Sequence, residues 1–141
     1  MGQLEGKVAL VTGAGSGFGE GIVKLYAREG AQVIVADINE DAANRVAAEI
    51  GSAALAIKGD VSKREDIQKM VDAGLAEFGS LDIVVNNAAI THKNQPMLEV
   101  DEEMFDRMFD VNVKSIYYMT HAVVPVMRKQ GKGVILNIGS T

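Results

Sequence analysis

The stretch VALVTGAGSGFG at residues 8–19 indicates the fold more strongly than any other part of the chain. Residues 8–11 form a short, continuous apolar run, which is typical of a strand buried on both faces of a parallel sheet. A glycine-rich turn follows at once, and residues 19–28 then carry a helical stripe of apolar side chains that Gly30 closes. The stretch therefore predicts a strand, a tight turn and a helix, in that order.

The same alternation continues along the chain. Further strands are predicted at residues 33–36, 53–57, 81–85 and 134–138, and further helices at 41–50 (from a start near Asn39), at 62–78 (from a capping box of Ser62 and Glu65) and at 101–129 (capped by Asp101). Strands that alternate with helices predict an α/β fold, a Rossmann-type doubly wound parallel sheet with five strands, in one domain over 1–141. Since the sequence stops just after the fifth strand, we expect this domain to be incomplete at its C-terminal end, with later strands missing.

Composition excludes several classes of function. The net charge of −5 is spread along the chain, which argues against nucleic acid as a partner. There are no cysteines and only two histidines, so we expect no disulfide and no metal site. No signal peptide and no apolar run near the ~18 residues of a membrane span is present, and we expect a soluble, cytoplasmic protein without membrane contact.

The turn at residues 12–19 has the spacing T-G-x-x-x-G-x-G. Backbone N–H groups and the helix dipole at such a turn attract a diphosphate, and glycine permits its close approach. A merely flexible turn is the alternative, but the position between a strand and a helix favours a dinucleotide site. The cofactor-binding residues predicted here are Gly13, Ser16, Gly17, Phe18 and Gly19.

Asp37 ends the second strand about 20 residues beyond the turn, where a carboxylate can accept hydrogen bonds from an adenosine ribose. A carboxylate there also repels the 2′-phosphate of NADP, at about 4 kcal/mol for two charges 4 Å apart at an effective dielectric of 20. Ser16 and Ile38 occupy the positions where a basic residue would compensate, so NAD is favoured over NADP. An aspartate that only begins a loop is the alternative.

Two further strand ends carry polar residues. Asp60 could meet an adenine amino group while Val61 packs on the ring, although Asp60 could equally only begin a turn. The fourth strand runs into Asn-Asn-Ala-Ala at 86–89, where adjacent amides need hydrogen-bond partners. The small side chains of Ala88 and Ala89, beside Asn87, leave room for a ligand's ribose.

Taken together, the glycine spacing, Asp37, the Asp-Val pair at 60–61 and the motif at 86–89 resemble a classical short-chain dehydrogenase/reductase. The resemblance spans the whole chain and is to the N-terminal portion of members such as 3-oxoacyl-ACP reductases and glucose 1-dehydrogenases. It implies hydride transfer between NAD and a secondary alcohol or ketone, with Ser140 orienting the substrate oxygen. It assigns Asn112, which disturbs its helix, to holding a relay water. It also implies a homotetramer built partly on the helix at 101–129.

The sequence departs from the family at one decisive place, because the motif Y-x-x-x-K is absent from the 141 residues. The residue four positions after each of the three tyrosines is not a lysine: it is Gly30 after Tyr26, His121 after Tyr117 and Ala122 after Tyr118. The 141 residues alone are therefore expected to be inactive, and two hypotheses stay open. The chain is either the N-terminal part of an NAD-dependent oxidoreductase or a non-catalytic dinucleotide-binding or assembly module complete at Thr141. Ser140 and the exposed apolar edge of the fifth strand count against the second hypothesis, and the substrate stays open.

Overall fold

A computed structural model describes residues 2–140, so the two ends of the domain expected over 1–141 lie outside the described residues. The strands are β1 (Val8–Thr12), β2 (Gln32–Asp37), β3 (Ala54–Lys58), β4 (Ile83–Asn86) and β5 (Val134–Asn137). The helices are α1 (Gly17–Arg28), α2 (Glu40–Ile50), α3 (Arg64–Phe78), the 3-10 turn η1 (Met97–Glu99), α4 (Glu102–Phe109), the π-helical turn η2 (Asp110–Lys114) and α5 (Ser115–Gln130). The predicted order of elements is confirmed.

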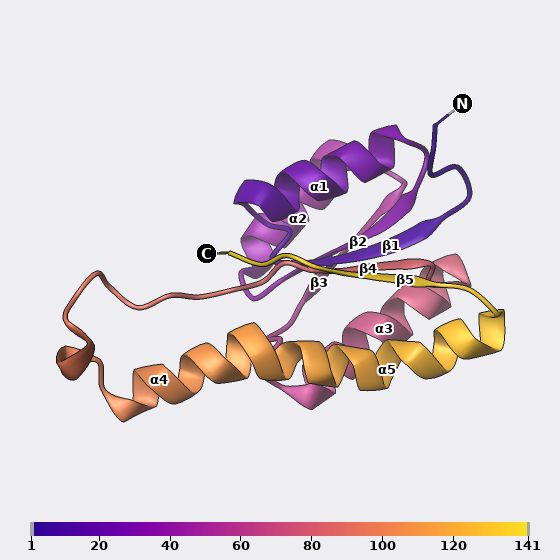
Figure 1. The fold of residues 1–141 in the computed structure, drawn as a ribbon. Coiled ribbons are helices and arrows are strands. Elements are labelled where there is room, and N and C mark those ends of the chain that lie inside the picture. Colours follow the sequence, from indigo (N-terminus) through magenta and orange to yellow (C-terminus); the bar gives the residue numbers. More distant parts are fainter. Residues whose placement is uncertain (1, 141) are drawn as a thin grey trace.

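All strand pairs are parallel, and the strand order is β3-β2-β1-β4-β5. The chain therefore builds the sheet outward from β1 in one direction and then returns to build it in the other. Helices α1 and α2 cover one face of the sheet, and α3 and α5 cover the other (Figure 1). The doubly wound architecture is confirmed. Its direction reverses between β1 and β4, and ligands of open α/β sheets bind at the carboxyl ends of the strands at such a reversal.

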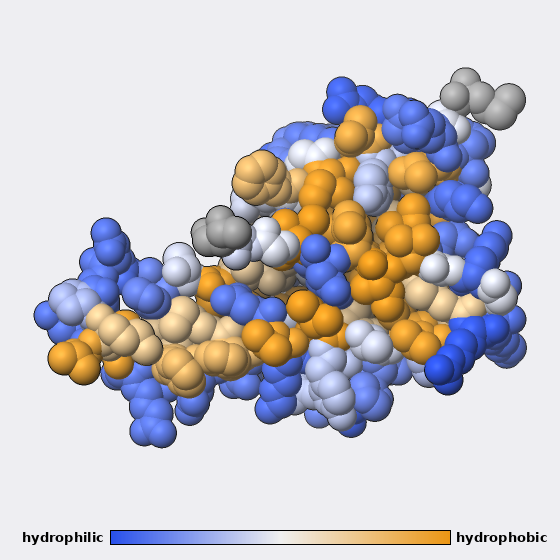
Figure 2. Space-filling model, in the orientation of Figure 1, coloured by the Kyte–Doolittle hydropathy of each residue, from blue (hydrophilic) through white to orange (hydrophobic). Residues whose placement is uncertain are grey.

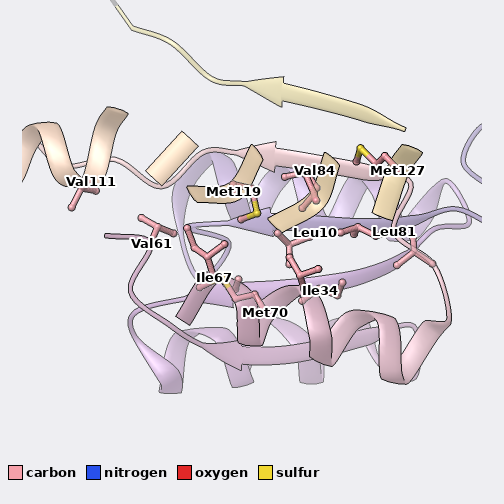
Figure 3. Close-up of a cluster of buried hydrophobic side chains, with 14 residues drawn as sticks. Leu10, Ile34, Val61, Ile67, Met70, Leu81, Val84, Val111, Met119 and Met127 are labelled. Atoms are coloured by element: carbon pink, nitrogen blue, oxygen red, sulfur yellow. The ribbon is translucent and has the colours of Figure 1, made fainter. Parts of the chain in front are cut away.

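Successive residues of each buried strand point to opposite faces, which explains why the strands are apolar throughout. Leu10, Ile34 and Val84 belong to the core on the α3 and α5 side, where Met70 and Met119 pack with them (Figure 3). A second core fills the α1 and α2 side, and its members include Val11, Val35, Val85, Val23 and Val46. The central strands are thus packed on both faces, and the loops at their carboxyl ends rest on this core.

The start of α3 corrects one prediction. Ser62 is not the N-cap of this helix, since α3 begins at Arg64 with Lys63 at the N-cap position and no side-chain cap. Instead, the backbone N–H and the hydroxyl of Ser62 both donate to Oδ1 of Asp60, at 2.9 and 2.6 Å. The competing carboxylate explains the error, because a hydroxyl that donates to Asp60 two residues earlier is drawn away from the helix.

The long helix predicted at 101–129 is α4, η2 and α5 in continuous succession. Its predicted cap is confirmed, because a carboxylate oxygen of Asp101 accepts from the N–H of Met104 at 2.7 Å. The disturbance expected around Asn112 is confirmed as well, since this residue lies within the π-helical turn. Helix α4 projects beyond the carboxyl end of the sheet, together with the loop that precedes it (Figure 1).

Strand β5 is the outer strand of the described sheet on its side. Val134 and Leu136 pair with β4 residues that face α1 and α2, yet they are 59% and 44% exposed. Figure 2 shows the resulting band of hydrophobic side chains over β5. Within residues 2–140, no helix has the length and apolar character that crossing a membrane demands. The cytoplasmic location stays a prediction.

Candidate functional site

Two neighbouring pockets open where the sheet reverses direction, at the carboxyl ends of β1 and β4. The first has a volume of ≈ 340 Å³ and the second of ≈ 520 Å³. Residues Ala88, Ala89 and Ile90 line both, so the two pockets adjoin along the segment after β4. Nine predicted cofactor residues line the first pocket: Gly13, Ser16, Asp37, Ile38, Asp60, Val61, Asn87, Ala88 and Ala89.

The glycine turn packs tightly against the segment after β4. A Cβ atom on Gly19 would lie 2.1 Å from the carbonyl oxygen of Gly13 and 2.6 Å from Nδ2 of Asn87, so no larger residue fits there. Gly17 has a φ of +56°, a conformation that L side chains rarely adopt. Both constraints lie in the short connection and the first helical turn that join the buried strand β1 to α1.

Helix α1 begins with N–H groups available to an anion. Ser16 occupies its N-cap position without a side-chain hydrogen bond to the first turn. The first N–H groups of a helix have no partner within the helix, and they attract phosphate. Ser16, Gly17 and Phe18 are exposed at this point, and the Phe18 side chain is 84% exposed. Gly17, Phe18 and Gly19, which the sequence also predicted to bind the cofactor, do not line the first pocket.

Asp37 is held in place by a hydrogen bond from the glycine turn at residues 12–19. Its Oδ2 accepts from the N–H of Gly15 at 2.8 Å, and its Oδ1 accepts from the N–H of Asn39 at 2.9 Å. The carboxylate thus fixes both the turn and the start of α2. Each oxygen of a carboxylate has a second acceptor position, so ribose hydroxyls could still donate to Asp37.

Asp60 and Val61 form the wall of the first pocket at the end of β3. Burial raises the pKa of Asp60, but the hydrogen bonds from Ser62 and the charges of Lys63 and Arg107 outweigh it and leave the pKa below its usual value. Asp60 therefore stays ionised, and it also begins a turn, as the alternative interpretation stated. Arg107 of α4 lines the same pocket, which the sequence did not indicate because its neighbours are acidic.

Thr12 and Asn87 join β1 to β4 at the reversal point. The hydroxyl oxygen of Thr12 accepts from the N–H groups of Asn87 and Ala88, both at 3.1 Å. Nδ2 of Asn87 donates to the carbonyl of Thr12 at 3.0 Å and to that of Gly13 at 3.3 Å. Asn86, its neighbour, donates to the side chain of Asn137 at 2.9 Å and so ties β4 to β5. Sequence reasoning missed Thr12, although a polar residue that ends an apolar strand was the available signal.

The second pocket brings together the two residues predicted to be catalytic, Asn112 and Ser140. Oδ1 of Asn112 accepts from the N–H of Ile90 at 2.9 Å, and Nδ2 donates to the carbonyl of Ile90 at 2.8 Å. Both ends of this amide are therefore engaged by one residue of the segment that the two pockets share. Ser140 is exposed beyond the end of β5. Within residues 2–140 no three acidic or histidine side chains cluster as a metal site would need.

Comparison with known proteins places this arrangement among relatives. The profile of the short chain dehydrogenase family matches residues 7–141. The chain is 46% identical to 4-formylbenzenesulfonate dehydrogenase of Comamonas testosteroni, with 99% of the chain and 56% of that protein covered. It is 44% identical to sorbitol dehydrogenase of Cereibacter sphaeroides, with 98% and 54% covered.

A solved structure is similar in fold and in sequence. The crystal structure of 3-ketoacyl-(acyl-carrier-protein) reductase from Brucella melitensis complexed with NADH matches with a TM-score of 0.95 and 50% identity, over 98% of this chain and 58% of that one. The chain thus spans about half the length of the curated relatives that it matches.

Proposed function

The chain belongs to the short-chain dehydrogenase family, and on that premise we propose that residues 1–141 form part of the NAD-binding Rossmann domain of an oxidoreductase. The reaction we propose is hydride transfer between nicotinamide and the carbon of a secondary alcohol or ketone. The observation that carries this proposal is the pair of adjoining pockets. One holds nine of the residues predicted to bind a cofactor, and the other holds Asn112 and Ser140.

A dinucleotide fits the first pocket and its border. Gly17 is exposed and nothing lies within 4 Å of its Cβ position, so the backbone of the turn is open there to a diphosphate. Asp37 would accept from the adenosine ribose, and Asp60 with Val61 would face the adenine. The NADH in the Brucella melitensis reductase supports a nicotinamide dinucleotide as the ligand class. From there the chain of shared residues, Ala88 to Ile90, leads toward the second pocket.

We propose NAD rather than NADP, because Asp37 would face the 2′-phosphate and the exposed Ile38 offers it no charge. The change Asp37→Asn removes the repulsion and keeps one oxygen that can accept from Gly15, and the bond from Asn39 that it loses affects both nucleotides alike. Its effect is bounded by about 4 kcal/mol, which is roughly a thousandfold change in the ratio of the NADH and NADPH dissociation constants. Fluorescence titration of both nucleotides measures that ratio, with Asp41→Asn on the exposed start of α2 as the control. An unchanged ratio in Asp37→Asn would contradict the assignment.

The roles proposed for the residues of the second pocket follow from which of their polar atoms can still form hydrogen bonds. Ser140 presents a hydroxyl that would donate to the substrate oxygen. The amide of Asn112 is engaged at both ends by Ile90, so a relay water would bind a backbone carbonyl of η2 rather than this side chain. A π-helical turn displaces carbonyls from their usual partners and is frequent at functional sites. Nicotinamide supplies the hydride acceptor or donor when it is bound.

The acid/base step has no candidate in this chain, because no tyrosine stands four residues before a lysine. We therefore propose that the 141 residues bind the cofactor without turnover, and that the substrate of the whole protein is a small alcohol or carbonyl compound. A module that only binds dinucleotide is the other hypothesis. The dehydrogenase and reductase names of the relatives lend it no support.

The decisive experiment is titration of the purified chain with NADH, followed by nicotinamide fluorescence. We expect a saturable enhancement that ADP-ribose reverses, since ADP-ribose carries the diphosphate and both of the groups that Asp37 and Asp60 would contact. AMP, which lacks the diphosphate bridge, should compete more weakly. A fluorescence response that stays linear in NADH would overturn the proposed function.

A homo-oligomer, of the tetrameric kind that the resemblance implies, is also proposed. Phe105, Phe109 and Tyr117 are 41%, 52% and 54% exposed along α4 and α5, and this apolar surface would suit a second copy. Sedimentation velocity would test it, with Phe109→Ser expected to shift the chain toward monomer. An identical sedimentation coefficient for both proteins, or a monomeric wild type, would contradict the proposed contact.

A further inference from the structure

Four charged side chains connect α1 to α2 directly behind the glycine turn. Nζ of Lys24 lies 2.6 Å from Glu20, and the guanidinium of Arg45 lies 2.9 Å from Glu20 and 2.9 Å from Glu49. Lys24 also contacts Glu49, which closes the network. The network holds two positive and two negative charges and is therefore neutral as a whole.

Arg45 reaches beyond this network to the turn itself. Its Nη2 donates to the carbonyl oxygen of Gly15 at 3.0 Å. The N–H of the same glycine donates to Asp37 at 2.8 Å. Gly15 is thus held by a carboxylate at the end of β2 and by a guanidinium from α2. It immediately precedes Ser16, the N-cap of the helix whose first N–H groups would bind the diphosphate.

We propose that Arg45 is a positioning residue for the dinucleotide: it holds the carbonyl of Gly15 and neutralises Glu20, and so keeps the turn in its binding conformation. This inference rests on the proposed function. A turn that is already ordered loses less freedom when the ligand binds, which raises affinity without a new contact to the ligand. Arg45 does not line either pocket and would act only through the turn.

Arg45 also offsets the charge of Glu20. Glu20 stands in the first turn of α1, close to the N–H groups that a diphosphate would use. Left alone, its carboxylate would repel the ligand. Hydrogen bonds from Arg45 and then from Lys24 lower the pKa of Glu20 to about 2, as expected of a carboxylate whose charge these two cations offset.

Arginine suits this position better than lysine. Its planar fork carries several donors in fixed directions, so one side chain can bind both oxygens of Glu20, an oxygen of Glu49 and the Gly15 carbonyl together. A lysine ammonium could keep the charge but not all of these contacts. Since the side chains involved are partly exposed, ion pairs of this kind contribute little to stability, and the expected consequence is for affinity.

The test compares Arg45→Gln and Arg45→Lys with the wild-type chain. We expect the dissociation constants for NADH and ADP-ribose to rise about three- to tenfold in Arg45→Gln, the range for one lost hydrogen bond, and less in Arg45→Lys. The matched control is Lys58→Gln, which removes one positive charge from an exposed pair with Glu40 without touching the turn. Its affinity should stay within about twofold of wild type, since exposed charges are strongly screened.

A readout without ligand separates positioning from a general loss of structure. Amide hydrogen exchange of the free chain should accelerate at residues 15–19 in Arg45→Gln and stay unchanged in the sheet. The melting temperature of Arg45→Gln should stay near that of wild type, because partly exposed ion pairs contribute little to stability, while its affinity for ADP-ribose is reduced.

Two outcomes would overturn the inference. The first is an equal affinity of Arg45→Gln and the wild-type chain for NADH, provided that the wild-type chain binds NADH saturably. The second is unchanged exchange at residues 15–19. If the wild-type chain itself does not bind NADH, the proposed function fails, and the exchange measurement still decides whether Arg45 orders the turn.

Discussion

Replacing Thr12 by valine should destabilise the protein without creating a cavity. The Thr12 side chain is 2% exposed, and its hydroxyl oxygen accepts from two N–H groups, those of Asn87 and Ala88. Valine has nearly the same shape but cannot accept, so both N–H groups lose their partner. A buried N–H without a partner costs about 1–3 kcal/mol. Because Asn87 and Ala88 are only half-buried, we expect the lower end, about 2 kcal/mol for the pair.

Urea unfolding followed by far-ultraviolet circular dichroism measures this change in the free energy of unfolding. Thr12→Ser keeps the hydroxyl and should recover most of the loss. The matched control is Thr120→Val, since the hydroxyl of Thr120 donates only to the carbonyl of Ile116 within an exposed turn of α5. That variant should stay within about 0.5 kcal/mol of wild type. Equal stabilities of Thr12→Val and Thr120→Val would show that the hydroxyl does not join β1 to β4 as argued.

Two further predictions concern α1. Gly19→Ala should abolish saturable NADH binding or unfold the chain, because its Cβ would lie 2.1 Å from the Gly13 carbonyl. The control is Gly21→Ala, whose Cβ meets no other atom within 4 Å. This variant should stabilise the helix by up to about 1 kcal/mol. Wild-type affinity in Gly19→Ala would contradict the packing of the turn. The second is a pH dependence: the pKa of Glu20 is lowered from 4.5 to about 2, so its stabilising effect is complete above 4.5 and is lost as the pH falls toward 2. An NMR titration of the Glu20 carboxyl carbon should give a pKa well below 4.5, and a value near 4.5 would refute the pairing.

The order of the elements was predictable because its signals are local. The apolar run at 8–11 and the glycines after it predict a strand and a turn within a dozen residues, and the structure contains β1 and the start of α1 at these positions. Asn39 caps α2 through a hydrogen bond to Ala42 at 3.0 Å, as its position suggested. The predicted start of α3 was wrong for an equally local reason, since Asp60 accepts the hydrogen bond from the hydroxyl of Ser62.

The residues of the site differ in how far the sequence predicted them. Those at strand ends, such as Asp37 and Asp60, meet in one pocket because the carboxyl ends of parallel strands share one edge of the sheet. Arg107 was not predicted, because nothing within its own helix distinguishes it from a solvent-exposed charge. The assignment of Asn112 depended on a resemblance, and its pairing with Ile90 is visible only in three dimensions.

The sequence by itself determined the succession of strands and helices, the glycine turn and the acidic residue that ends β2. Each of these is specified by residues a few positions apart, whose backbone hydrogen bonds and side-chain periodicity are local. Tertiary structure alone decided that β1 lies between β2 and β4. That placement brings Thr12 to Asn87, 75 residues away, and Arg45 to Gly15, 30 residues away. Such contacts depend on how helical crossovers return the chain to the sheet, and no local pattern records them.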